Sequence, residues 1–215
     1  MVNTAAVVAA RRYHPRMRAA ILLLVLGLLG AKPVTFPVVF HVAVVQDAPV
    51  VEPAWLDAQL AQANAIFADH GVQLVRQAIV PLPEEHALLE DRADRNALGA
   101  RLQPRVINAF IVASLRDVDD PTRLRQGVHW RPYGRKADAR GRVKHLVIVA
   151  AYARPTVLAH ELGHFFDNPQ HSTVPGNIMS YQRGETLPVL DARQSRRMQG
   201  AARRFRRTGE LVPAP

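Results

Sequence analysis

The 215-residue sequence contains no cysteine and few aromatic residues. Without cysteine there is no disulfide bond and no thiolate ligand, so a metal ion would need histidine or carboxylate ligands. A chain without cysteine also fits a bacterial exported protein. Aromatic residues make up 6% of the chain, and no nucleic-acid-binding motif or aromatic-interleaved basic patch accompanies its basic residues. We therefore expect no nucleic-acid partner.

The chain also lacks an apolar run of the length that a membrane-spanning helix needs, about 20 residues. The apolar run at residues 19–31 is shorter, and it follows Arg11, Arg12, Arg16 and Arg18. A positive segment before a short apolar run is typical of a signal peptide. We expect residues 1–31 to be a signal peptide or an N-terminal membrane anchor. The protein would then be exported, either periplasmic or secreted, or associated with the membrane through residues 19–31. N-terminal sequencing of the cell-derived protein tests this, because cleavage would leave a start near residues 30–33.

The remaining composition is that of one globular domain. Hydrophobic residues make up 48% of the chain, which is enough for a core, and the length favours one domain. The net charge is +10, but residues 1–31 hold four arginines and no acid. The rest of the chain is therefore only modestly basic. We expect residues 32–215 to form a single domain and to act as a monomer.

The most informative stretch begins at His160 and reads H-E-L-G-H. Residues four apart lie on one face of a helix, so His160 and His164 can direct two imidazoles at one metal ion. Glu161 projects about 100° away, within reach of a water at the metal but not as a ligand. A catalytic zinc ion takes three protein ligands and leaves one position for water. Two histidines therefore call for a third ligand.

His171 is the candidate for that third ligand, because Asp-Asn-Pro precedes it and ends the helix. Further on, the chain reads Asn-Ile-Met-Ser-Tyr, with Met179 and Tyr181. Together these residues resemble the metzincin metallopeptidases, which have H-E-x-x-H-x-x-G-x-x-H followed by a turn that carries a methionine. Met179-Ser180-Tyr181 is similar to the Met-x-Tyr of the astacin and serralysin branches.

The resemblance implies a zinc-dependent endopeptidase that acts on a peptide or protein substrate. His160, His164 and His171 would hold Zn²⁺, and Glu161 would be the general base. Met179 would pack beneath the histidines as the Met-turn residue, and Tyr181 would assist catalysis. The implied fold is α/β and zincin-like. It has a twisted, mostly parallel sheet with a backing helix, an active-site helix, the Met-turn and a C-terminal helix.

The chain departs from the metzincin pattern between the second and third histidines. Seven positions separate His164 from His171, where the family has six, and no glycine stands in the turn. One interpretation puts Asn168 in place of the glycine and makes the helix one residue longer. A second makes the protein a zinc hydrolase of another plan, with Glu185 or Asp191 as the third ligand. A third makes it a non-enzymatic, membrane-associated binding protein.

The pattern of apolar residues predicts the elements around this site. Strands are expected at residues 36–45, 72–80, 106–113 and 144–151, and helices at 53–70, 84–98 and 191–207, with the active-site helix starting near Thr156. Asp117, Asp119 and Asp120 are expected in a solvated turn. Residues 127–133 are expected in a hairpin or loop near the cleft, where Trp130 and Tyr133 would line a substrate groove or pack in the core.

Overall fold

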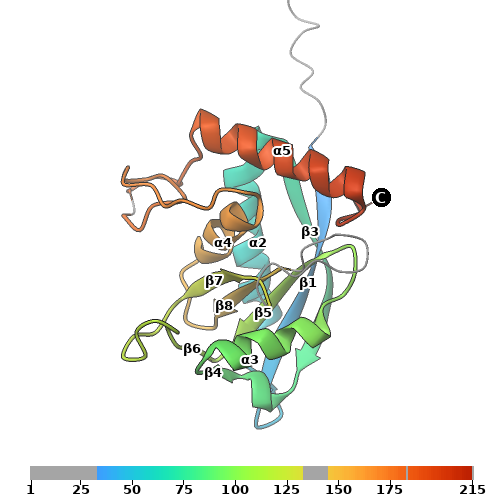
Figure 1. The fold of residues 1–215 in the computed structure, drawn as a ribbon, viewed down its shortest axis with the longest axis vertical. Helices are drawn as coiled ribbons and strands as arrows, with labels where there is room; N and C mark the ends of the chain where they lie inside the picture. The colour runs from blue at the N-terminus through green and yellow to red at the C-terminus, as the bar shows by residue number, and fades with distance from the viewer. Residues whose placement is uncertain (1–32, 133–144, 183, 215) are drawn as a thin grey trace, which may run out of the picture. The chain divides into compact units, whose positions relative to one another are not determined.

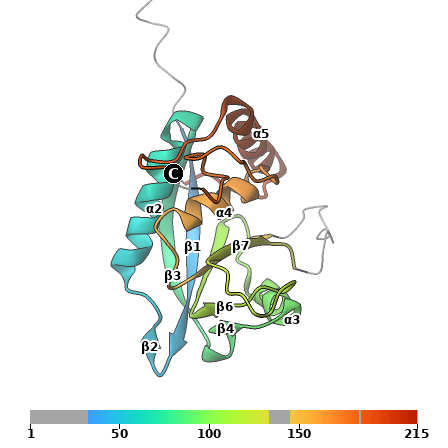
Figure 2. The same ribbon diagram turned by 90° about the vertical axis from the view of Figure 1, so that its left-hand side faces the viewer.

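The computed structural model describes residues 33–132, 145–182 and 184–214. The chain separates into two units, residues 1–32 and 33–215, and the second is described below. Its architecture is mixed α/β, with helices on both faces of a mostly parallel sheet (Figures 1 and 2). The predicted fold class is therefore confirmed. The predicted signal peptide or anchor and Tyr133 lie outside the described residues. None of the described helices is long and apolar enough to cross a membrane.

The sheet is built around strand β1 (Val34–Val45), which pairs in parallel with β3 (Val72–Leu82) and with β5 (Ile107–Val112). Strand β8 (Leu146–Ala150) continues the parallel sheet beside β5. Strand β7 (Gly127–Trp130) pairs antiparallel with β8 and is the last strand on that side. All six residues of β5 are buried, because apolar side chains on both faces of the strand meet packed layers. The four predicted strands are all present.

The first crossover follows from local sequence signals. Two residues with positive φ, Gln46 and Asp47, turn the chain at the end of β1 into a short antiparallel strand, β2 (Ala48–Pro49). Pro53 then starts helix α2 (Pro53–Phe67), where its missing N–H and fixed φ suit the first turn. Gly71, at φ 71°, ends the following 3₁₀ turn and leads into β3.

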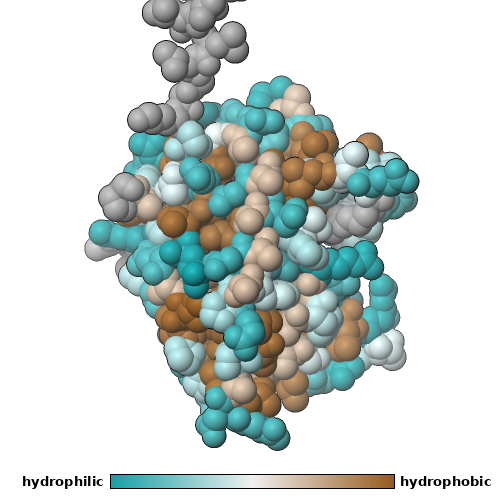
Figure 3. Space-filling view, turned by 180° about the vertical axis from the view of Figure 1, so that it is seen from behind, coloured by the Kyte–Doolittle hydropathy of each residue, from teal (hydrophilic) through white to brown (hydrophobic). Residues whose placement is uncertain are grey.

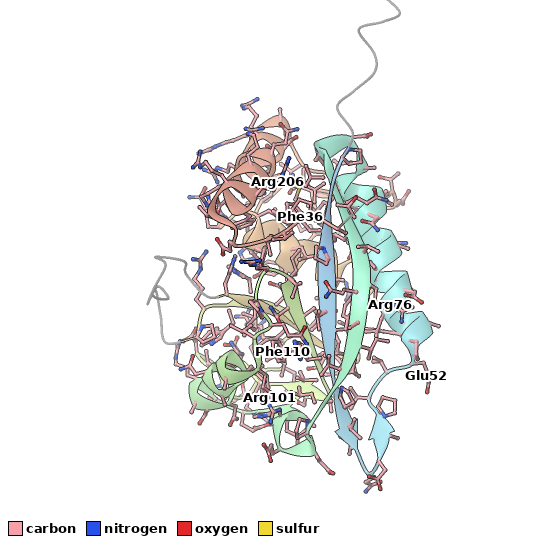
Figure 4. All side chains as sticks on the ribbon, turned by 90° about the vertical axis from the view of Figure 1, so that its right-hand side faces the viewer. Phe36, Glu52, Arg76, Arg101, Phe110 and Arg206 are labelled. Carbon is pink, nitrogen blue, oxygen red and sulfur yellow. The ribbon has the colours of Figure 1, made fainter. Side chains whose placement is uncertain are left out.

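Two cores form on the two faces of the sheet. On one face, helices α2, α4 (Val157–Phe165) and α5 (Ala192–Thr208) cover side chains such as Phe36. On the other, α3 (Arg92–Ala97) and its neighbouring turns cover side chains such as Phe110. In Figure 4, Phe36 lies on the side of α5 and Phe110 on the side of α3. One side of α5 is buried in the first core by four residues: Met198, Ala201, Ala202 and Phe205.

The prediction of one polar helix over residues 84–98 is wrong. The segment contains a 3₁₀ turn (Glu84–His86), strand β4 (Leu88–Leu89) and α3. Leu89 is fully buried because β4 pairs with β6 (Ser114–Leu115), which a continuous helix would prevent. A capping box at Asp91 then starts α3 afresh.

The edge of the sheet opposite β7 is formed by β3. Its outward side chains include Val75 and Ile79, which are 40% and 38% exposed. Arg76 of the same strand pairs with Asp57 of α2 at 3.1 Å. From behind, the molecule shows apolar patches interrupted by hydrophilic side chains (Figure 3). The histidine site lies elsewhere, between α4 and β7.

Candidate metal centre

Helix α4 carries His160, Glu161 and His164. Its buried residues include Leu158, Leu162 and Phe165, which belong to the core and fix the rotation of the helix. His160 and His164 are one helical turn apart, and their ring centroids lie 5.0 Å from each other. The two imidazoles therefore face the same space, as the spacing predicts.

His171 comes to the same place from the segment after α4. Its Nε2 lies 3.2 Å from Nε2 of His164, and its ring centroid is 5.3 Å from that of His160. One ligand atom from each of the three histidines lies within 4.8 Å of the others. Zinc–nitrogen bonds of 2.0–2.1 Å in a tetrahedron put ligand nitrogens about 3.3 Å apart. The donor set and its spacing therefore suit a zinc ion.

Backbone carbonyls orient the two imidazoles of the helix. Nδ1 of His160 donates to the carbonyl of Ile178 at 2.7 Å, and Nδ1 of His164 donates to the carbonyl of Asn168 at 2.7 Å. Because a carbonyl can only accept, Nδ1 carries the hydrogen and Nε2 carries the lone pair. Burial lowers the pKa of His164 to about 4, and burial together with Arg125 lowers that of His171. Neutral imidazole, the form that binds metal, is thus favoured.

The turn between the helix and His171 differs from the interpretation that used Asn168. Helix α4 ends at Phe165 and is not extended, and the left-handed residue is Asp167, at φ 67°. Asp167 lies three positions after His164, where the metzincin pattern has its glycine, and aspartate tolerates this conformation better than most residues. The extra residue therefore falls between Asp167 and His171. The carboxylate of Asp167 binds Arg204 of α5.

Met179 lies against the active-site helix. It is fully buried, and a Cβ placed on Gly163 would come 2.3 Å from its Sδ. Glycine is therefore required at position 163 for this contact. Asn177 accepts a hydrogen bond from the backbone N–H of Met179 at 2.9 Å, and its amide donates to Gln194 of α5 at 2.8 Å. The turn is thus tied to both α4 and α5.

Glu161 is buried, at 6% exposed, on the side of α4 that meets β7. A Cβ on Gly127 would lie 2.8 Å from its Cγ, so only glycine lets β7 approach this closely. Burial raises the pKa of Glu161 to about 8, although the backbone N–H of His129 and the charge of Arg125 oppose the rise. The carboxyl group can therefore exchange a proton near neutral pH.

Tyr181 lies at the mouth of the site. It is 63% exposed, and its ring centroid is 4.4 Å from that of His171. Tyr181 interacts with the guanidinium of Arg125, and both side chains line the cleft. The carboxylates considered as alternative ligands lie outside the histidine cluster. Asp191 caps α5 by accepting from the N–H of Gln194 at 2.8 Å, and Glu185 is exposed.

Several residues of the site have no counterpart among the sequence predictions. Arg125 and His129 reach it through long-range contacts that no local pattern reveals. Gly127 does have a signal, because glycine inside a strand marks a close approach. Asp117, expected in a solvated turn, is buried and pairs with Arg125 at 2.7 Å. Trp130 does line the cleft, and its Nε1 donates to Asn96 at 3.0 Å.

The chain resembles known proteins in structure and not in sequence. No protein-family model and no curated protein sequence matches the chain. Among solved structures, metalloproteinase-II from Bacteroides fragilis matches with a TM-score of 0.54 at 14% identity, covering 80% of this chain and 55% of that one. A mirolysin complex matches with a TM-score of 0.60 at 13% identity, covering 84% of this chain and 97% of that one. Mature mirolysin of Tannerella forsythia with a cleaved peptide gives 0.57 at 14% identity, with the same coverage of each chain. The chain therefore shares its zincin-like α/β fold with these solved structures.

Proposed function

We propose that the protein is a zinc-dependent endopeptidase. The observation that carries this proposal is the convergence of three imidazoles at zinc-ligand spacing beside the buried carboxyl group of Glu161. The fold shared with the metalloproteases supports it. When bound by His160, His164 and His171, zinc would make the scissile carbonyl and a water molecule more reactive and favour the ionised form of Glu161.

Glu161 is the general base in this proposal. It accepts a proton from the attacking water and returns it to the leaving amine, a role for which a pKa above the ordinary carboxyl range is suited. The backbone N–H of His129 holds the carboxylate in place. Tyr181 donates its hydroxyl hydrogen to the developing oxyanion.

The alternatives are less well supported by the arrangement of side chains. A carboxylate ligand would have to come from Asp191, which caps α5, or from the exposed Glu185. A binding protein needs no buried carboxyl group beside its metal, yet burial of Glu161 costs free energy. A role of Glu161 as general base would explain why this costly burial is present.

A set of variants tests the assignment. Glu161→Gln should keep one zinc ion per chain and lose about 10²–10⁴-fold in activity, because only the base is removed. His171→Ala should weaken zinc binding by orders of magnitude, since one of three strong donors is lost. Glu185→Gln is the matched control and should change neither. Zinc content by mass spectrometry and digestion of a peptide library measure both properties. A fully active Glu161→Gln would contradict the proposal, and unchanged zinc affinity in His171→Ala would remove His171 from the ligand set.

Tyr181→Phe separates transition-state stabilisation from packing. The ring contact with His171 survives this change and the hydroxyl is lost. We expect unchanged zinc content and a fall mainly in kcat, because the hydroxyl acts chiefly in the transition state. Unchanged kcat would assign Tyr181 to packing alone.

A further inference from the structure

The cleft at the histidines, with a volume of about 1080 Å³, is rich in arginine. Its lining arginines come from α3, from the segment before β7, from the end of β7 and from the segment before α4: Arg92, Arg95, Arg123, Arg125, Arg131 and Arg154. Four carboxyl groups line it as well: Asp117, Asp119, Glu161 and Asp167. Asp167 pairs with Arg204, which is not among the lining residues, and Glu161 is buried. Asp117 and Asp119 pair with Arg125 and Arg92, so the lining arginines still outnumber the carboxylates that face the cleft.

Arg125 is held in a defined position in the cleft. Its Nε donates to Asp117 at 2.7 Å, and its backbone N–H donates to the carbonyl of Leu115 at 2.8 Å. The side chain of Asp117 is 5% exposed and that of Arg125 is 43% exposed, so the carboxylate lies behind the guanidinium. The N–H of Asp119 and the guanidinium of Arg125 lower the pKa of Asp117, which keeps the pair charged. A preorganised guanidinium loses little entropy when it binds an anion.

Arg125 also lies close to the histidine site. It lines the same cleft as Tyr181, whose ring contacts His171. Glu161 and His171 line this cleft as well. An anionic side chain bound by Arg125 would therefore belong to a substrate residue close to the scissile bond.

Two further arginines, Arg92 and Arg95, lie beside Trp130 at the far end of β7, and Arg92 pairs with Asp119. The ring of Trp130 has the guanidinium of Arg95 at 5.0 Å and that of Arg92 at 6.0 Å from its centroid. Arg95 is buried and donates to the carbonyl of Arg116, so it is fixed as well. Arg92, Arg95 and Arg125 therefore line the same cleft as strand β7.

We propose that the cleft selects peptides with acidic side chains, and that Arg125 is the residue that determines this specificity. The proposal rests on the proposed function and names the substrate class of that site. Guanidinium binds a carboxylate with two parallel hydrogen bonds, which neutral and basic side chains cannot form.

Cleavage of matched peptides tests the proposal. The zinc-loaded protein is given peptides that differ only in carrying Glu, Gln or Lys at each position around one scissile bond. We expect the Glu peptide to be preferred at one or more positions. Arg125→Gln should lower kcat/KM for that peptide by roughly ten- to hundred-fold, the effect of a lost charged hydrogen bond, and change the Gln peptide by less than about three-fold. Arg125→Lys should keep part of the preference.

Arg196→Gln is the matched control, because it removes the same charge from the exposed face of α5. It should leave the preference unchanged. An equal loss on the Glu and Gln peptides in Arg125→Gln would overturn the proposal and leave Arg125 as a positioning residue for Tyr181. A wild-type preference for the Gln or Lys peptide would overturn it as well.

Binding measured without cleavage separates the two proposals. Fluorescence anisotropy of labelled Glu and Gln peptides on full-length Glu161→Gln should show tighter binding of the Glu peptide. Substitution of Arg125 by Gln should remove this difference. If the peptides bind in this way but the wild type cleaves none of them, acidic recognition stands and the peptidase proposal fails. If peptides are cleaved and neither assay shows a preference for Glu, the peptidase proposal stands and acidic recognition fails.

Discussion

At the scale of single residues, the histidine site depends on two glycines as much as on its polar side chains. Gly163 makes room for Met179, and Gly127 makes room for Glu161. The sequence predicts that His160 and His164 face one space, because helical periodicity alone decides it. It cannot predict which side chain packs against a glycine, because that side chain belongs to another element. The position of Gly127 inside a strand indicates a close approach, but only the fold shows that Glu161 and Met179 are the partners of Gly127 and Gly163.

Gly163→Ala should disturb the metal centre without touching a ligand. Its Cβ would overlap Sδ of Met179, and overpacking of this kind costs about 1–3 kcal/mol. The carbonyl of Ile178, the residue before Met179, accepts the hydrogen bond that orients His160. A displacement of Met179 should therefore move this imidazole and lower zinc affinity as well. Urea denaturation of the metal-free protein and zinc titration measure the two effects.

Two further variants make this prediction specific. Gly200→Ala lies in helix α5 with nothing within 4 Å of the new Cβ, so it should stabilise the protein by about 0.5–1 kcal/mol. Met179→Ala relieves the overlap, and the double variant with Gly163→Ala should therefore be more stable than the sum of the two single changes indicates. Additive effects would show that the contact is not what makes glycine necessary.

At the scale of elements, sequence reasoning succeeds where one local signal decides and fails where tertiary pairing does. Pro53 and Asp191 begin helices as expected. The segment at residues 84–98 has helix-forming composition, but pairing of β4 with β6 divides it. The turn before His171 fails for a subtler reason. Both Asp167 and Asn168 tolerate the left-handed conformation, and only packing decides between them.

The turn at Asp167 can be tested by comparing two substitutions. Asp167→Gly and Asp167→Ala both remove the pair with Arg204, but only alanine keeps the cost of positive φ. We expect the glycine variant to be more stable than the alanine variant by about 1 kcal/mol. Arg204→Ala measures the loss of the pair by itself. Urea denaturation gives the three free energies of unfolding, and equal values for Gly and Ala would contradict a left-handed residue 167.

At the scale of the whole molecule, the chain's charge is visible in the sequence but its placement is not. The arginines of the cleft come from four separate segments, so only the fold brings them together. The folded protein also contains histidines whose pKa is lowered, chiefly by burial: His41, His70, His86, His129, His145, His164 and His171.

These histidines should make the metal-free protein sensitive to acid. Above pH 6.5 neither the folded nor the unfolded state protonates them, and their full contribution to stability is present. Below pH 6.5 the unfolded state binds more protons, so the free energy of unfolding falls as the pH falls towards the lowered pKa values. Glu161 acts in the opposite sense, because its raised pKa makes the folded state bind the extra proton between pH 4.5 and about 8.

Urea denaturation of Glu161→Gln in the presence of a chelator isolates the histidines. Its free energy of unfolding should fall between pH 6.5 and 4.5, more steeply than that of the metal-free wild type. His86→Gln, in which one of these histidines is replaced, should reduce the slope. A stability that stays constant or rises over this range would contradict the pKa shifts.

The short strand β7 has a consequence for protein engineering. Gly127 and His129 face α4, where they contact or hydrogen-bond Glu161, whereas Val128 and Trp130 pack against the other core. Substitutions at alternate positions of this four-residue strand should therefore have different effects. A side chain at 127 would crowd the carboxyl group of Glu161, whereas a substitution at 129 keeps the backbone N–H that faces it. Changes at 128 and 130 would alter packing against the other core. A library that redesigns the cleft can therefore vary every second residue of this strand and keep the others fixed.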